Sequence, residues 1–394
     1  MKKIIAYVMT SIAAAIAAVI LALFLTAPSS IKPETFGASK YDSIRSLCLT
    51  DSGYMLAGMT MSSGLGYVDA YMIGLDKRGK KIWENTFGGK EDDRIFDIIN
   101  NGAGYVMAGY TASYGAGDND FYMISANEKG DMKYSKTFGT PGKDEAYSLV
   151  ETPDKGYVLA GMSYSTGKNG YPQAYAVKTD ADGNSIWSMT YSSGKYDVAS
   201  CVINAVDGGY IICGTSAAPS GHGMQDMLML KLDSRGNTLW AKFYGGAQPD
   251  FGSRVVAARD GGYAMIGTTA SFGAGNSDIY LVKTDALGNS LWARTYGGPG
   301  VDQGVTLINS GDGGYILGGN SESFSYGSSD LLVIAVDASG NSLWTRHFGG
   351  KSDDYLGGIV KNKDGGYAIA GWTSSYGAGD YDAYFLKIRK NGNF

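Results

Sequence analysis

The chain has 394 residues, of which 44% are hydrophobic and 18% are charged, so it can bury a large core and is expected to be globular. Its formal net charge is −5 at pH 7. Binding to nucleic acid requires clustered Lys and Arg that neutralise phosphates, so this charge balance predicts no nucleic-acid partner. The 59 glycines recur at fixed positions beside Tyr and Trp, which indicates tight turns between strands and not a low-complexity sequence.

An uncharged apolar segment runs from Ile4 to Leu25. A helix over this segment would be about 33 Å long, which is enough to cross a bilayer. Residues 1–30 are therefore predicted to be a signal-anchor or a cleaved signal peptide, and Pro28 beside the small residues disfavours cleavage. In both cases the two lysines at the N-terminus are expected to stay in the cytoplasm. The rest of the chain is then expected outside the cytoplasm, anchored in the cytoplasmic membrane or secreted.

A repeat fills the chain after residue 30. The motif Asp-x-x-Gly-Asn-x-x-Trp, clearest in Asp233–Trp240, returns at intervals of about 52 residues. A period of this length, on short strands punctuated by Gly and aromatic residues, predicts a propeller or a solenoid. A second anchor is a Gly-Tyr pair that opens a short apolar run, with its tyrosine at Tyr54, Tyr105, Tyr157, Tyr210, Tyr263, Tyr315 and Tyr367.

Each repeat is predicted to be a four-stranded antiparallel meander. In the fifth repeat, β-branched runs separated by turn residues predict strands at 251–258, 263–269, 278–284 and 290–296. The hairpin signal Asp260-Gly261 joins the first two strands. One such sheet cannot bury both of its faces, but seven sheets packed around an axis can, so the predicted fold is a β-propeller.

The first residues after the apolar segment are predicted to close the ring. Residues 31–37 align with 82–88, the fourth strand of the first repeat, whereas the seventh repeat stops at Phe394 before its own fourth strand. The N-terminal strand is therefore expected to pair with residues 382–389 and to remove an open sheet edge. The predicted fold is all-β: residues 31–394 form a seven-bladed β-propeller of four-stranded antiparallel blades, with the N-terminal strand closing the last blade, preceded by one N-terminal hydrophobic helix.

The pattern Asp-x-x-Gly-Asn-x-x-Trp-x-x-x-x-Gly resembles the tryptophan-docking repeat of quinoprotein dehydrogenases and of the β-propeller scaffold lipoprotein of bacterial outer-membrane assembly. It is more similar still to the secreted β-propeller-repeat proteins of bacteria and archaea. The resemblance covers residues 31–394 and implies the propeller fold, but not quinoprotein activity, because the chain has no adjacent Cys-Cys pair. It also implies packing between blades for Trp83, Trp187, Trp240, Trp292 and Trp344, with Tyr134 in the second repeat. We therefore expect Trp240 to be buried between blades.

Two acidic positions recur along the repeats, one before the predicted first strand and one before the third. A catalytic carboxylate would occur once, so the favoured interpretation is that these Asp side chains cap backbone N–H groups where loops meet strands. The alternative is calcium in the Gly-Ala-Gly loops, because carboxylates and carbonyls offer hard oxygen ligands. The candidate calcium ligands are Asp118, Asp120, Asp380 and Asp382; no other metal or cofactor is predicted.

Histidine and cysteine offer little material for an active site. His222 and His347 lie in different repeats and are expected at the surface, so neither a transition-metal site nor a Ser-His-Asp triad is predicted. Three cysteines do not make a disulfide framework. Cys201 and Cys213 flank a hairpin turn and are interpreted as buried small hydrophobic residues, while Cys48 has no evident partner.

The loops between the second and third strands are predicted to carry any partner contact. Antiparallel strands alternate ends, so these loops share one face with the connections between repeats, and the Asp-Gly hairpins share the other face, next to the membrane. Residues 163–173 and 216–226 depart most from the repeat. Aromatic residues at the loop tips, such as Tyr67 and Phe272, either form a ligand platform or pack down between blades. The candidate partner-binding residues are Tyr164, Lys168, Asn169, Tyr171, His222, Met224 and Gln225.

These features favour a non-catalytic, extracytoplasmic, membrane-anchored propeller that serves as a protein-binding or scaffolding module of the cell envelope. One alternative is an enzyme or lectin-like protein that acts on a surface polysaccharide, which a non-repeating cluster of charged residues at the centre of the ring would favour. Another alternative is an accessory subunit of a membrane or surface assembly. The expected partners are the membrane, through the N-terminal helix, and either a protein or a surface glycan.

Overall fold

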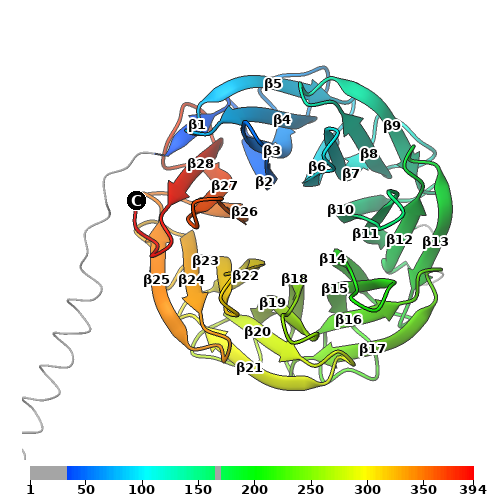
Figure 1. The fold of residues 1–394 in the computed structure, drawn as a ribbon, viewed down its shortest axis with the longest axis vertical. Coiled ribbons are helices and arrows are strands. Elements are labelled where there is room, and N and C mark those ends of the chain that lie inside the picture. Colours follow the sequence, from blue (N-terminus) through cyan, green and yellow to red (C-terminus); the bar gives the residue numbers. More distant parts are fainter. Residues whose placement is uncertain (1–32, 165–169) are drawn as a thin grey trace, which may run out of the picture. The chain divides into compact units, whose positions relative to one another are not determined.

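The computed structural model describes residues 33–164 and 170–394. Within these residues the chain forms seven four-stranded antiparallel sheets, arranged as blades around a central axis (Figure 1). This arrangement confirms the predicted seven-bladed, all-β propeller. The predicted N-terminal helix lies outside the described residues, and among the described residues no helix is long and apolar enough to cross a membrane.

Blades 1 to 4 follow one another along the chain, each from its innermost to its outermost strand (Figure 1). Their strands are β2 (Asp42–Leu49), β3 (Gly53–Thr60), β4 (Asp69–Asp76) and β5 (Lys81–Phe87) in blade 1; β6 (Asp93–Asn100), β7 (Tyr105–Thr111), β8 (Asp120–Ala126) and β9 (Met132–Phe138) in blade 2; β10 (Asp144–Glu151), β11 (Tyr157–Ser163), β12 (Gln173–Thr179) and β13 (Ser185–Tyr191) in blade 3; and β14 (Asp197–Asn204), β15 (Tyr210–Ser216), β16 (Asp226–Leu232) and β17 (Thr238–Tyr244) in blade 4.

Blades 5 and 6 repeat this order, and blade 7 takes its outermost strand from the N-terminus of the propeller. The strands are β18 (Asp250–Ala257), β19 (Tyr263–Thr269), β20 (Asp278–Thr284) and β21 (Ser290–Tyr296) in blade 5; β22 (Asp302–Asn309), β23 (Tyr315–Ser321), β24 (Asp330–Val336) and β25 (Ser342–Phe348) in blade 6; and β26 (Asp354–Lys361), β27 (Tyr367–Thr373), β28 (Asp382–Ile388) and β1 (Glu34–Phe36) in blade 7.

The ring is closed where β1 pairs with β28. The strands are antiparallel, with Glu34 opposite Phe385 and Phe36 opposite Ala383, so the predicted closure is confirmed over a shorter stretch than 31–37. Phe36 is buried. The pairing gives blade 7 its fourth strand and leaves β28 without an open edge.

The middle strands of each blade are buried on both faces, because they lie between two neighbouring blades. All seven residues of β8 are buried, whereas the outermost strand β9 has no buried residue. Strands covered on both faces favour continuous apolar runs, which explains the apolar runs after each Gly-Tyr anchor. The cores lie between blades: one joins Met55 and Met72 of blade 1 to Ile95 and Tyr122 of blade 2.

The strand order gives the propeller two faces. The hairpins between first and second strands and the turns between third and fourth strands lie on one, the hairpin face. The loops between second and third strands and the connections between blades lie on the other, the long-loop face. On the long-loop face, bridges between Tyr41 and Tyr381 and between Ser277 and Val301 tie each loop to the connection into the next blade.

An outer-strand aromatic ring of one blade packs on the Asp-x-x-Gly turn of the next. Gly288 has φ +74°, and a Cβ there would lie 2.8 Å from the Trp240 ring, so the turn needs glycine for both its backbone and this approach. Trp240 packs between blades as predicted, but the prediction that it is buried there is wrong: Trp240 and the other tryptophans of the outermost strands are half-buried. The same contact joins Trp83 to Gly130, Tyr134 to Gly183, Trp187 to Gly236, Trp292 to Gly340 and Trp344 to Gly392.

The contact differs where the ring closes. Position 32, which aligns with the tryptophans, is a lysine. The turn glycine of blade 1, Gly79, is covered instead by Phe385 of β28, whose ring lies 2.6 Å from where its Cβ would be. Lys80 adds an ion pair to Glu34 of β1 at 2.5 Å. The contact between blade 7 and blade 1 is therefore still present, but a different side chain makes it.

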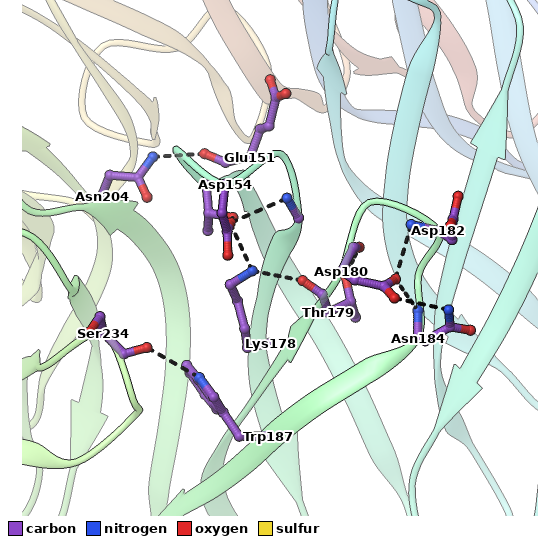
Figure 2. A network of polar contacts seen from close by, with 12 residues as sticks. Glu151, Asp154, Lys178, Thr179, Asp180, Asp182, Asn184, Trp187, Asn204 and Ser234 are labelled. Carbon is purple, nitrogen blue, oxygen red and sulfur yellow. Dashed lines mark hydrogen bonds and ion pairs between the residues drawn. The ribbon is translucent and has the colours of Figure 1, made fainter.

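The recurring spacing of Asp and Asn in the repeat is explained by the hydrogen bonds of the turn (Figure 2). The Oδ1 atom of Asp180 accepts hydrogen bonds from the backbone N–H of Asp182 at 3.0 Å and of Asn184 at 2.8 Å, and Asn184 Nδ2 donates to Asp180 Oδ2 at 3.0 Å. Trp187 Nε1 donates to the carbonyl of Ser234 in the next blade at 3.3 Å. The most repetitive motif of the chain is therefore a turn and a blade-to-blade contact.

Candidate functional site

The recurring acids act as caps. Asp250 Oδ2 accepts hydrogen bonds from Gly246 N and from Ser271 Oγ, both at 2.7 Å. The backbone contact from the residue four positions earlier recurs in all seven blades, which supports the capping interpretation over a catalytic one. The capping acids are Asp42, Asp93, Asp144, Asp197, Asp250, Asp302 and Asp354.

The candidate calcium loops are also held by backbone hydrogen bonds. Asp120 Oδ2 accepts from two backbone N–H groups at 2.9 and 3.0 Å, and Asp382 Oδ2 does the same at 2.9 and 2.8 Å. Asp118 and Asp380 are exposed. Among the described residues no group of three His, Cys, Asp or Glu side chains could hold a metal ion. The loop geometry is thus explained without calcium.

The predicted partner-binding residues lie on the long-loop face, in the loops after β11 and β15. Tyr164 is 40% exposed, Tyr171 51% and Met224 68%, and Gln225 is half-buried. Lys168 and Asn169 lie outside the described residues. Among the described residues of the two loops, Tyr164, Tyr171 and Met224 are therefore accessible, as a contact surface requires.

The two histidines differ in environment. His222 is at the surface as predicted; its backbone N–H donates to Asp226 Oδ2 at 2.8 Å, and its Nδ1 lies 3.7 Å from Asp226 Oδ1. The surface prediction for His347 is wrong. Its ring is half-buried with its centroid 5.3 Å from that of Phe324, and burial lowers the pKa of His347 to about 4.

A β-bulge interrupts every innermost strand at the same place. One extra residue follows the third residue of the strand, so that in β2 the pairing shifts between Ile44 and Ser46. Bulges re-aim side chains and are common beside functional sites. All seven bulge residues are half-exposed, and together they form the bulge ring: Arg45, Phe96, Tyr147, Ser200, Ser253, Val305 and Gly357.

Residues that directly follow the bulges of blades 1, 2, 3 and 5 form a buried polar cluster on the axis. Asp97 of blade 2 accepts hydrogen bonds from Ser46 Oγ at 2.8 Å, Ser148 Oγ at 3.1 Å and Leu149 N at 3.1 Å. Arg254 Nη2 of blade 5 lies 3.9 Å from Asp97 Oδ1, so this ion pair crosses the axis. Burial would lower the pKa of Arg254, but the Asp97 carboxylate raises it.

The cysteines border this cluster and are buried or half-buried thiols. Cys201 and Cys213 face each other in the register of β14 and β15 and are both buried, which confirms their interpretation as buried small residues. Cys48 is half-buried. Burial, with a smaller effect from the Asp97 charge, raises the pKa of Cys48 to about 12. Such a thiol is a poor nucleophile.

Aromatic and arginine side chains gather on one side of the bulge ring. The guanidinium carbon of Arg45 lies 4.0 Å from the ring centroid of Trp372, and Trp372 stacks on Tyr355 with centroids 5.4 Å apart and an angle of 25°. Phe96 meets Tyr147 at 5.2 Å. In blades 4 to 6 the bulge residues are small. We call the side chains from blades 7, 1, 2 and 3 the axial arc: Arg45, Arg94, Phe96, Tyr147, Tyr355 and Trp372.

The acids near the axial arc already have partners. Arg94 Nη2 lies 3.4 Å from Asp92 Oδ2, and the hydroxyl of Tyr147 donates to Glu145 Oε2 at 2.8 Å. Tyr164 and Tyr196 lie close enough to Tyr147 to contribute, after burial and Glu145, to its raised pKa. One predicted contact residue, Tyr164, therefore borders the axial arc.

Sequence reasoning missed the axial arc and the Asp97 cluster. It selected residues from loops that break the repeat, whereas these side chains lie inside strands that keep it. The available signal was the third and fourth residues after the recurring Asp that precedes each predicted first strand, where Arg, Phe, Tyr, Ser, Val, Asp and Gly replace one another between repeats. A position that varies between repeats inside an otherwise regular strand indicates a side chain whose role is specific to its blade and is not part of the repeated fold.

Comparisons with known proteins agree with the fold. No protein-family model matches the chain. Part of it is 26% identical over 259 residues to the regulatory protein FlaEY of Caulobacter vibrioides, a match covering 57% of this chain and 26% of that protein. The chain therefore spans about a quarter of that relative's length.

Solved structures with a similar fold include WD40 propellers. The WD40 β-propeller domain of Doa1 superposes with a TM-score of 0.53 at 9% identity, covering 90% of this chain and 97% of that one. The WD40 domain of Neurospora crassa Pan2 also gives 0.53, at 10% identity, with 88% and 91% covered. At these identities the likeness shows a β-propeller and nothing about activity.

Proposed function

We propose that the propeller is a non-catalytic protein-binding module whose partner docks on the long-loop face, over the axial arc and the divergent loops after β11 and β15. The observation that carries this proposal is the axial arc itself. Trp, Tyr and Arg are the residues that dominate binding energy at protein interfaces. Here they gather on one side of the axis, whereas the bulge residues of blades 4 to 6 are the small Ser200, Ser253 and Val305.

The cellular setting belongs to the same proposal. The uncharged segment 4–25 supports a membrane anchor, which would hold the module outside the cytoplasm as part of the cell envelope. The hairpin face would then lie next to the membrane, because β1 enters its blade from that face. The long-loop face would remain free for a protein partner or for a larger membrane or surface assembly.

The non-repeating Asp97 and Arg254 pair is the observation that favours an enzyme instead, for example one acting on a surface polysaccharide. Its geometry favours a structural role. Asp97 is buried, and both of its carboxylate oxygens accept hydrogen bonds, so it has little capacity left to take a proton from a substrate. The pair therefore supports a structural link between blades 2 and 5 across the axis more strongly than an active site.

A photo-crosslinking amino acid tests the binding proposal in intact cells. Placed at Tyr171 or Tyr355 on the long-loop face, it should give a discrete crosslinked protein, whereas Leu287, which is 65% exposed on the hairpin face, serves as the matched control. Equal crosslinking from both faces, or none from the long-loop face, would overturn the proposal.

A further inference from the structure

Arg45 is a half-buried cation without a carboxylate. Among the described residues it makes no ion pair, and its Nε–H group is buried without a hydrogen-bond acceptor. The other two arginines near the axis differ, because Arg94 pairs with Asp92 and Arg254 with Asp97. An unpartnered buried donor is destabilising, and more so on a charged group. The protein therefore keeps at Arg45 a donor that no group of the described residues satisfies.

The stacking of Arg45 orients its donors. A guanidinium that lies on an aromatic ring keeps the N–H groups on its edge free, and this edge matches the two oxygens of a carboxylate. Arg45 lies on Trp372, and Trp372 is held in turn by Tyr355. The guanidinium thus rests on a fixed ring and needs little ordering when it binds.

Arg45 has a second cation, Arg94, close enough to act on it. Burial lowers the pKa of Arg45, the phenol of Tyr41 opposes this effect, and the positive charge of Arg94 adds to it. Three acids near the axial arc already have partners: Asp92 pairs with Arg94, the hydroxyl of Tyr147 donates to Glu145, and the hydroxyl of Tyr381 donates to Asp353 at 3.3 Å. Arg94 Nε is also buried without an acceptor. Two neighbouring guanidinium groups therefore retain unused donors at one place.

We propose that Arg45 and Arg94 bind a carboxylate from an acidic segment of the protein partner. This inference rests on the proposed function and adds the chemistry of the segment that the axial arc recognises. Trp372 is covered by Arg45 and Tyr355, so it offers no open face of the kind on which a sugar ring stacks. The unused groups are N–H donors, which pair with acidic side chains.

The direct test titrates the full-length protein in detergent with three probes by isothermal calorimetry. The probes are a tetraglutamate peptide with neutral ends, the matching tetraglutamine peptide and tetragalacturonate. Tetraglutamate should bind at least about tenfold more tightly than tetraglutamine, and its affinity should fall as salt rises. No binding by tetraglutamate up to about 10 mM, or tighter binding by tetragalacturonate, would overturn the proposal.

Variants locate the contact. Arg45→Gln should weaken tetraglutamate binding by at least about tenfold, and Arg45→Lys by less, because lysine keeps the charge but loses the planar fork. Arg235→Gln, at an exposed arginine on the hairpin face, should leave affinity unchanged. An Arg45→Gln variant that binds as tightly as the parent would overturn the assignment, and the comparison of peptides in the parent stands even where a variant folds poorly.

The two proposals fail in different ways. If tetraglutamate does not bind but crosslinks from Tyr171 persist, the partner docks on the long-loop face without using Arg45, and only the acidic-segment inference is lost. If the crosslinks are also absent, the binding function itself is lost.

Discussion

The outer rim of the propeller repeats the same residues and contacts in each blade, whereas the residues at its axis differ from blade to blade. On the rim one contact recurs: an aromatic ring packs on the glycine of the Asp-x-x-Gly turn in the next blade. Where blade 7 meets blade 1, Phe385 makes this contact in place of an outer-strand aromatic residue. On the axis, the fourth and fifth residues of the innermost strands differ from blade to blade. Repetition on the rim creates one blade-to-blade interface many times, whereas variation on the axis places single side chains such as Arg45, Asp97 and Arg254.

This difference separates stability from recognition. A rim contact stabilises two neighbouring blades, so its loss should lower the stability of the ring. A side chain of the axial arc is half-exposed and packs on few neighbours, so its loss should affect binding more than folding. The variants below are arranged from the largest expected effect on stability to the smallest.

Opening the ring should have the largest effect. Deletion of residues 1–37 removes β1, leaves β28 as an unpaired edge and exposes the surface that Phe36 buries. The melting temperature should fall by at least about 10 °C, measured by differential scanning calorimetry at one scan rate. Deletion of residues 1–30 is the matched control, because it removes the apolar segment but keeps β1. Equal melting temperatures for the two deletions would show that the closure contributes little.

Breaking the ion pair on the axis should have the next largest effect. Asp97→Ala removes the acceptor of two serine hydroxyls and leaves Arg254 without its partner. Removing one member of a fully buried pair costs about 3–5 kcal/mol. The Arg254 side chain is 32% exposed, so we expect about 2–3 kcal/mol in denaturant unfolding.

A double variant sharpens this prediction. Replacing both charges, as Asp97→Leu with Arg254→Met, should recover part of the loss, because no charge is then left buried alone. If Asp97→Ala leaves the free energy of unfolding unchanged, the ion pair does not stabilise the axis. That result would favour a chemical role for Asp97 over a structural one.

Most of the rim could be predicted from the sequence, and most of the axis could not. Gly288 and Trp240 recur at one spacing with their equivalents, so a local turn and a blade contact explain them in every repeat. The Asp caps follow for the same reason. The pairing of Asp97 with Arg254 depends instead on which blades face each other across a closed ring of seven, and on bulges that hydrophobic periodicity does not reveal. The exposure of Trp240 was also misjudged, since strand order alone does not show how much of an outer strand the next blade covers.

Truncating a rim aromatic should have a moderate effect. Trp240→Ala removes the contact with Gly288, and a fully buried aromatic would cost about 3–5 kcal/mol. Because Trp240 is half-buried, we expect about 2 kcal/mol, measured by denaturant unfolding. Its neighbour Leu239 is 58% exposed, so Leu239→Ala should change stability by less than about 0.5 kcal/mol. Similar losses for both variants would mean that the tryptophan has no special place in the rim.

Calcium should have the smallest effect on stability. This experiment tests whether the repeated Gly-Ala-Gly loops are purely structural, like the rim contacts, or also bind a ligand. Asp120 and Asp382 already accept two backbone hydrogen bonds each, and their neighbours Asp118 and Asp380 are exposed. A carboxylate that is satisfied in this way gains little from a metal ion, so millimolar CaCl2 should shift the melting temperature by no more than about 1 °C relative to EDTA. MgCl2 at equal concentration controls for ionic strength. A rise of several degrees with CaCl2 alone, abolished by Asp118→Asn with Asp380→Asn, would show that these loops are metal sites and that repetition in this chain serves binding as well as stability.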